Sequence, residues 1–182
     1  MNPVLEQPCL WVVLTMLGIA AVTDLRSGLI PNSLPLLGAA AGGLVQLWAA
    51  GGSGASLTSA LADMGLGLLA CSIVPSVLYA CGGLGGGDLK LFAAIGLCVG
   101  PATGLEIQLG AHLLLALVLP LYFLWRGGLR RTFGGTFRLV RNAFSPPAHR
   151  MPLDRTQLTS LRFAPAIFGA ALWVACFGGS LP

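Results

Sequence analysis

Two aspartates stand beside strongly apolar stretches, where an acid is costly. Asp24 follows the first apolar stretch, and Asp88 follows a run of glycines between two later ones. An ionisable group at the edge of lipid is rarely present for stability alone. Neighbouring glycines remove side-chain bulk and let another backbone approach the Asp88 carboxyl. The pattern therefore predicts a catalytic acid that a peptide chain can reach.

The two carboxyl groups would form an aspartic pair if the helices that carry them are neighbours. Repulsion between close carboxylates keeps one of them protonated near neutral pH. The ionised member can then take a proton from water while the protonated member donates to the scissile carbonyl. No serine–histidine or cysteine–histidine arrangement competes on this side, since His149 stands in a basic loop with no evident partner.

Each acid also has a purely structural interpretation. Asp24 could be a solvated helix end paired with Arg26, and Asp88 could cap the next helix while Lys90 reaches the lipid surface. Asp154 lies in a polar loop and is expected to be solvated. The glycine run and the shared side of Asp24 and Asp88 favour a site.

The elements that must position these acids are membrane spans. The 182 residues are 55% hydrophobic and 9% charged, with a mean hydropathy of +0.85. A soluble domain could not cover its surface with so few polar groups. We therefore expect an all-α, polytopic membrane protein of about six helices in a single domain over residues 1–182. The expected spans are 4–23, 33–50, 58–81, 89–105, 107–125 and 161–178.

The basic residues predict the orientation. With the N-terminus outside, all ten Lys and Arg fall on the inner side, at Arg26, at Lys90 and in or beside the loop 126–160. The positive-inside rule supports this topology, which puts Asp24 and Asp88 on the same, cytoplasmic side. The net charge of +4 is thus a topology signal and does not indicate nucleic-acid binding.

The loop 126–160 contains an amphipathic pattern. Apolar residues recur at helical steps over 129–144, with Arg130, Arg131, Arg138 and Arg141 between them. This pattern predicts either contact with anionic lipid headgroups or a basic connection that only fixes topology. The five cysteines form no Cys-x-x-Cys pair, so we expect small apolar packing residues and no zinc site.

Two motifs resemble the signatures of type IV prepilin peptidases. The first is Asp24 with the downstream Ile30-Pro31-Asn32, and the second is Gly85-Gly86-Gly87-Asp88-Leu89-Lys90, the Gly-x-Gly-Asp motif with its following lysine. The segment 162–167 is similar to an element near the last span of that family, with Ala164 where a glycine is usual.

The resemblance implies an intramembrane aspartic endopeptidase that removes the short basic leader of pilin-like precursors at the bacterial inner membrane. It implies that Asp24 and Asp88 are the catalytic pair and that Gly85 and Gly87 shape the loop. Lys90, Pro31 and Asn32 would hold geometry or orient substrate. Because the chain lacks paired cysteines, it resembles the short, peptidase-only branch that serves tight-adherence pili. We therefore expect no methyltransferase activity, no metal and no cofactor.

Other functions fit the same sequence. A preflagellin peptidase or another Gly-x-Gly-Asp protease would share the chemistry. A cation transporter would need acids near the midplane and an inverted repeat, and neither is evident. A non-catalytic scaffold of a secretion system would require both acids to be dispensable. In the outer half, Asp63 and His112 are expected to pair with each other, and Glu106 to be a solvated span end.

Overall fold

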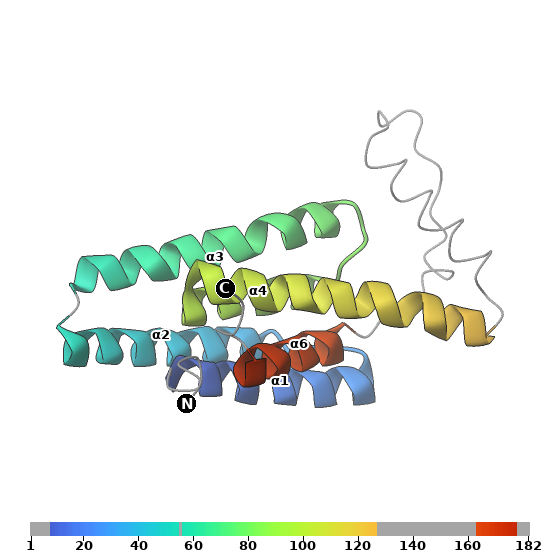
Figure 1. Cartoon of the computed structure of the whole chain (residues 1–182), viewed down its shortest axis with the longest axis horizontal. Coiled ribbons are helices and arrows are strands. Elements are labelled where there is room, and N and C mark those ends of the chain that lie inside the picture. The colour runs from blue at the N-terminus through green and yellow to red at the C-terminus, as the bar shows by residue number, and fades with distance from the viewer. Residues whose placement is uncertain (1–7, 55, 127–162, 178–182) are drawn as a thin grey trace.

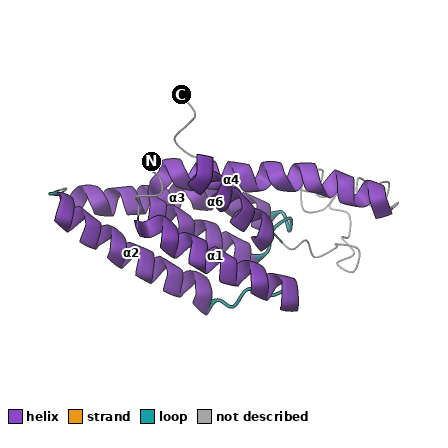
Figure 2. Ribbon diagram, turned by 60° about the horizontal axis from the view of Figure 1, so that its bottom comes forward, coloured by secondary structure: helices purple, strands orange, loops and turns teal. Residues whose placement is uncertain are grey.

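The computed structural model describes residues 8–54, 56–126 and 163–177, and every regular element in these ranges is a helix. The helices are α1 (Pro8–Ser27), α2 (Ser33–Ser53), α3 (Leu57–Ala80), α4 (Gly86–Arg126) and α6 (Ala164–Phe177). They lie roughly parallel or antiparallel in one bundle (Figures 1 and 2). The all-α prediction is confirmed.

Four of the described helices are long and apolar enough to cross a membrane, namely α1, α2, α3 and α4. The sequence predicted about six spans. The difference arises because the expected spans 89–105 and 107–125 are the two halves of α4, which are counted together, and because the expected span 161–178 corresponds to α6, which has 14 residues. Many large apolar side chains on α2 and α3 are exposed, as suits a surface that faces lipid.

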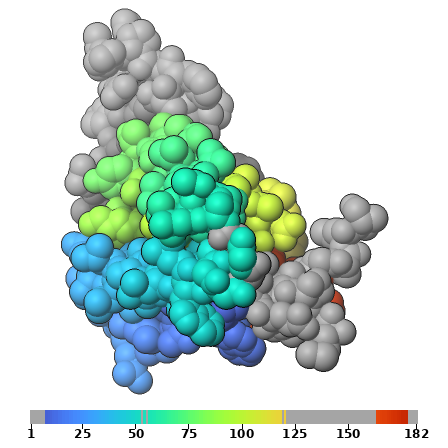
Figure 3. All heavy atoms as spheres, turned by 90° about the vertical axis from the view of Figure 1, so that its left-hand side faces the viewer, coloured from blue at the N-terminus to red at the C-terminus, as the bar shows by residue number. Residues whose placement is uncertain are grey.

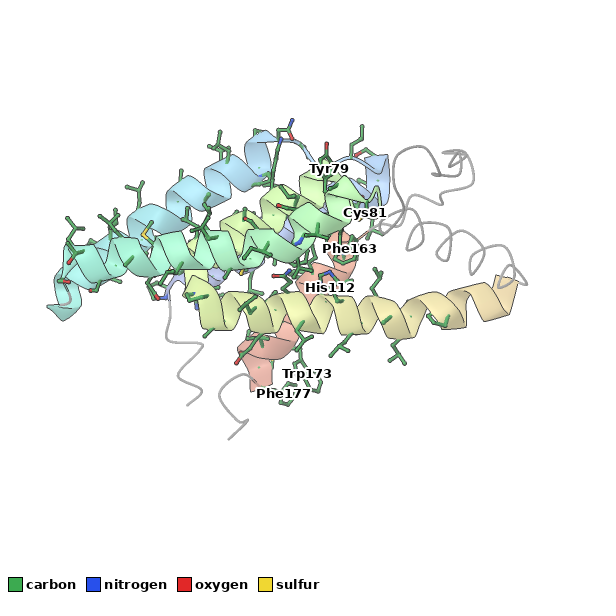
Figure 4. All side chains as sticks on the ribbon, turned by 90° about the horizontal axis from the view of Figure 1, so that it is seen from above. Tyr79, Cys81, His112, Phe163, Trp173 and Phe177 are labelled. Atoms are coloured by element: carbon green, nitrogen blue, oxygen red, sulfur yellow. The ribbon has the colours of Figure 1, made fainter. Side chains whose placement is uncertain are left out.

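α4 folds back on itself at Gly100. This glycine has φ 76° and ψ 177°, which is not helical and lies in the region that favours glycine. The two halves of α4 then run side by side in opposite directions (Figure 4). Gly104 approaches Gly96 so closely that an added Cβ would lie 3.1 Å from the Gly96 Cα. The reversal of direction expected between the spans 89–105 and 107–125 is thus present, but it lies at Gly100.

Glycines also let α3 cross α4 at close range. A Cβ added to Gly67 would collide with the backbone of Gly96, and a Cβ added to Gly96 would collide with the backbone of Gly67. Glycine lets backbones approach in this way because it has no side chain. Figure 3 views the bundle from the end that carries the α2–α3 connection, where α2, α3 and α4 lie next to one another.

The buried core lies between α1, both halves of α4, and α6. It contains Leu10, Val13 and Leu17 of α1, Phe92 and Ile95 of the first half of α4, Ile107 and Ala111 of the second half, and Ile167 and Ala171 of α6. The helices α1, α4 and α6 therefore hold the ends that carry the two acids in fixed relation.

The α1–α2 connection, the α3–α4 connection and the start of α6 lie at one end of the bundle (Figure 1). Arg26 and Lys90 stand at this end, and α4 runs past it to its last residue, Arg126 (Figure 1). The loop 127–160, with its amphipathic stretch 129–144 and Asp154, lies outside the described residues.

Candidate active site

Asp24 lies in the last turn of α1 and is buried, with 6% of its surface exposed. The helix ends because Gly28 adopts a left-handed conformation with φ 66°, and the Gly28 N–H donates a 2.9 Å hydrogen bond to the Asp24 backbone carbonyl. The side chain of Asp24 thus points from a rigid helix into the bundle rather than into an open loop.

Asp88 is the third residue of α4 and has 9% of its surface exposed. Gly82, with φ 77°, ends α3, and the Leu89 N–H bonds to the Gly85 carbonyl at 3.2 Å to begin α4. The alternative interpretation of Asp88 as the N-cap is therefore wrong, since that position belongs to Gly85. The Asp88 side chain turns back to the Gly85 backbone, as the third residue of a capping box does.

The structure brings Asp24 and Asp88 together, close enough for the two side chains to interact electrostatically. The two residues belong to different helices and are joined only by tertiary packing. The Asp88 Oδ1 atom is buried and has no hydrogen-bond partner within the described residues. Two interacting carboxyl groups, both largely shielded from solvent, are groups of the kind that can carry out general acid–base chemistry.

Lys90 and Asn32 fix the turn between α1 and α2 to the start of α4. The Lys90 Nζ donates a 2.9 Å hydrogen bond to the Asn32 Oδ1. Asn32 precedes α2 and makes no side-chain cap hydrogen bond to that helix, because its oxygen serves Lys90 instead. The Pro31 carbonyl accepts a hydrogen bond of 3.0 Å from the Leu34 N–H and starts α2.

Gly85 and Gly87 both stand where a side chain would come very close to a neighbouring residue. A Cβ added to Gly87 would lie 3.1 Å from the Ile30 Cβ, so this glycine lets the α1–α2 turn approach α4. A Cβ added to Gly85 would lie 3.1 Å from the Asp88 Oδ2. Both glycines therefore contact the elements that carry the acids.

A contact that sequence reasoning missed involves the start of α6. The Ala164 N–H donates a hydrogen bond to the Asp24 Oδ2 at 3.3 Å. Ala164 is buried and belongs to the segment 162–167, whose resemblance had no assigned role. A backbone donor carries no residue-type signature, so only the resemblance of the segment 162–167 pointed to this element.

His112 does not pair with Asp63, so that expectation is wrong. The His112 ring stacks on Phe92 at 5.7 Å between centroids and meets Phe163 edge-on at 5.4 Å. Asp63 instead lies beside Gly100, where an added Cβ would be 2.9 Å from its Oδ2. The helix after the fold begins at Pro101 rather than at residue 107, which moves His112 about three turns from the outer end.

All five cysteines lie in the described part of the chain and carry free thiols. Within that part, no group of three or more His, Cys, Asp or Glu side chains is placed to hold a metal ion.

The model of the type IV leader peptidase family matches residues 11–121, which is more than half of the chain and includes both aspartates. No curated protein and no solved structure matches. The chain therefore belongs to the type IV leader peptidase family, and the protein is a multi-pass membrane peptidase.

Proposed function

We propose that the protein is an intramembrane aspartic endopeptidase that removes the short basic leader from type IV pilin-like precursors. Asp24 and Asp88 form the catalytic pair. The observation that carries the proposal is the meeting of these two buried carboxyl groups, one from the end of α1 and one from the start of α4. The protein's membership of a leader peptidase family supports the substrate class.

The reaction follows from the pair. The ionised carboxylate takes a proton from water, and the resulting hydroxide attacks the scissile carbonyl carbon while the protonated carboxyl donates to the carbonyl oxygen. When the tetrahedral intermediate collapses, the C–N bond breaks and the leaving amine receives a proton from the pair. The pair needs no metal or cofactor for these transfers.

The proposed location is the bacterial inner membrane, with the pair near the cytoplasmic face. The charges support this orientation, because Arg26 and Lys90 stand at the end of the bundle that holds Asp24 and Asp88, and α4 runs past that end to Arg126. A basic leader would remain on the inner side while the apolar stem of the precursor stays in the membrane. We also propose that the protein does not transfer methyl groups, since the sequence has no Cys-x-x-Cys pair.

The test is cleavage of pilin-like precursors from the same genome, co-expressed with the wild-type protein, Asp24→Asn or Asp88→Asn. These variants nearly preserve shape but remove the titrating proton. The proposal expects the wild type to shorten a precursor and both variants, though stably inserted, to leave it intact. Cleavage by either variant at the wild-type rate would reject the aspartic pair, and no cleavage by the wild type would favour a scaffold.

The methyltransferase claim has its own test. Purified protein is incubated with cleaved pilin and radiolabelled S-adenosylmethionine, and the label on the pilin terminus is measured. Incorporation above a protein-free blank would refute the peptidase-only proposal.

A further inference from the structure

Three buried side-chain atoms in the described part of the chain have no hydrogen-bond partner. They are Asp88 Oδ1, His112 Nε2 and Gln108 Oε1. The first belongs to the proposed catalytic pair, but the other two come from the second half of α4 and have no role so far. Unpaired polar atoms in a membrane interior are costly, so such atoms call for a partner that arrives from elsewhere.

His112 contacts two aromatic residues that lie near the aspartates in the sequence. Phe92, on which its ring stacks, follows Asp88 by one helical turn. Phe163, which meets the ring edge-on, directly precedes the Ala164 N–H that binds Asp24. Figure 4 shows His112 and Phe163 side by side between the second half of α4 and the start of α6. One aromatic residue therefore lies between the histidine and the elements that hold each acid.

The hydrogen bond of the His112 ring determines which of its two nitrogens donates and which accepts. The His112 Nδ1 is 2.7 Å from the Gln108 backbone oxygen, and a carbonyl oxygen only accepts, so Nδ1 carries the proton and donates. In the neutral ring the remaining nitrogen, Nε2, is then an acceptor. The amide oxygen of Gln108 is also an acceptor, and the Gln108 side chain has only 4% of its surface exposed.

The missing partner must therefore donate hydrogen bonds. A peptide can be cleaved only where it is unwound, and an unwound segment in the membrane exposes N–H groups that water cannot satisfy. His112 and Gln108 are one turn apart, about 5–6 Å along the helix, which is close to the length of two residues of extended chain. The two acceptors match two donors of such a segment in number, and the residues that carry them are spaced about as those donors are.

We infer that His112 and Gln108 form a substrate-binding site that accepts hydrogen bonds from backbone N–H groups of the unwound precursor, next to the scissile bond. This inference rests on the proposed function. Since the ring nitrogen is buried beside Phe92 and Phe163, one of these rings turns aside when the substrate enters.

The test uses full-length protein in lipid nanodiscs and synthetic precursor peptides with a basic leader, a glycine and an apolar stem. His112→Phe keeps a ring for stacking but removes the acceptor, whereas His112→Gln restores an acceptor near the position of Nε2 without the ring. Gln108→Met removes the amide at similar volume. Leu109→Ala, on the exposed side of the same helix turn, is the matched control.

We expect His112→Phe and Gln108→Met each to lower kcat/KM by about tenfold, the effect of one lost hydrogen bond, mainly through KM. His112→Gln and Leu109→Ala should stay near the wild type. Full activity in His112→Phe together with loss in His112→Gln would show that only the ring packing matters and would overturn the inference.

A second series distinguishes the peptide backbone from a bound water molecule as the donor. Peptides carry one N-methyl group on each amide around the cleavage site in turn, which removes a single N–H donor. At one position the methyl group should cost about tenfold in the wild type and almost nothing in His112→Phe, because both changes remove the same bond. Equal losses in both proteins at every position would indicate a water molecule and overturn the inference.

The series also separates the inference from the proposed function. If the wild type cleaves no precursor, the proposed function fails and the inference fails with it. If the wild type cleaves, both aspartate variants do not, and His112→Phe and Gln108→Met match the wild type, only the inference is rejected.

Discussion

The Lys90 ammonium group holds the side chain of Asn32 at 2.9 Å and so ties the turn after α1 to the first turn of α4. Each of these residues stands near one of the two aspartates in the sequence, Asn32 after Asp24 and Lys90 after Asp88. Lys90 thus connects α4 to the turn between α1 and α2. Its hydrogen bond opposes separation of the ends of the helices that carry the acids.

Removing this hydrogen bond should loosen the pair without unfolding the protein. Both side chains are exposed, so Lys90→Met and Asn32→Ala should each cost about 1 kcal/mol or less in stability. We expect precursor cleavage to fall by up to about tenfold in each variant, and the double variant to be no worse than either single one. Cleavage rates of the four proteins in one lipid preparation would measure this.

Asn32→Asp is the matched control for that prediction. It keeps an oxygen that can accept from the Lys90 Nζ, so it should cleave like the wild type. Equal impairment of Asn32→Asp and Asn32→Ala would contradict a role for the accepted hydrogen bond.

The glycines before Asp88 should differ in their tolerance of alanine. A Cβ at Gly86 would be 3.5 Å from the nearest atom, in the Tyr79 ring, which is ordinary contact. A Cβ at Gly87 would press on the Cβ of Ile30 at 3.1 Å, and a Cβ at Gly85 would press on the Asp88 carboxyl. Gly86→Ala should therefore keep full cleavage, whereas Gly85→Ala and Gly87→Ala should lose most of it.

Thermal unfolding in detergent provides the check on this glycine series. Alanine in a helix lowers the free energy by roughly 0.5–1 kcal/mol relative to glycine, so Gly86→Ala should be as stable as the wild type or more stable. Loss of activity in Gly86→Ala comparable to that in Gly87→Ala would show that the run is needed for flexibility rather than for close approach.

The crossing of α3 and α4 should tolerate larger side chains less than any other part of the fold. Alanine at Gly67 would overlap the backbone of Gly96, whereas alanine at Gly65, two residues earlier, would meet nothing within 4 Å. Overpacking of this kind costs about 1–3 kcal/mol, and a helix backbone cannot easily move aside. Gly67→Ala should lower the melting temperature by several degrees, and Gly65→Ala should leave it unchanged.

Much of this arrangement could be predicted from the sequence because it follows from local patterns. Apolar length predicted the helices, and the positions of Arg26 and Lys90 predicted that both aspartates share one end of the bundle. The Gly-x-Gly-Asp motif predicted the loop at Asp88. These features depend on the cost of polar groups in lipid, which acts on each stretch of chain separately.

Contacts between distant segments could not be predicted in the same way. The depth of His112 depended on where the second half of α4 begins, and an error of about two turns gave it the wrong partner, Asp63. The role of Ala164 was hidden because the donor is a backbone N–H, which every residue except proline provides. The hydrogen bond from Ala164 to Asp24 forms because α6 packs against α1.

The Ala164 N–H gives the most specific prediction about the start of α6. Ala164 is the first residue of that helix, a position where proline is tolerated because its N–H makes no intrahelical bond. Ala164→Pro would remove the donor to the Asp24 Oδ2 and leave α6 in place. Hydrogen bonds to charged groups are worth about 1.5–3 kcal/mol, so cleavage should fall by about ten- to a hundredfold.

Ala164→Gly is the control for this change, because it keeps the N–H and adds no bulk. It should cleave precursors like the wild type, with a small loss of stability from the more flexible backbone. Both variants should show unchanged helix content by circular dichroism, so that a difference in cleavage reports on the single hydrogen bond. Wild-type cleavage by Ala164→Pro would mean that Asp24 is held by packing of α1 alone, and that the 3.3 Å contact with Ala164 has no part in catalysis.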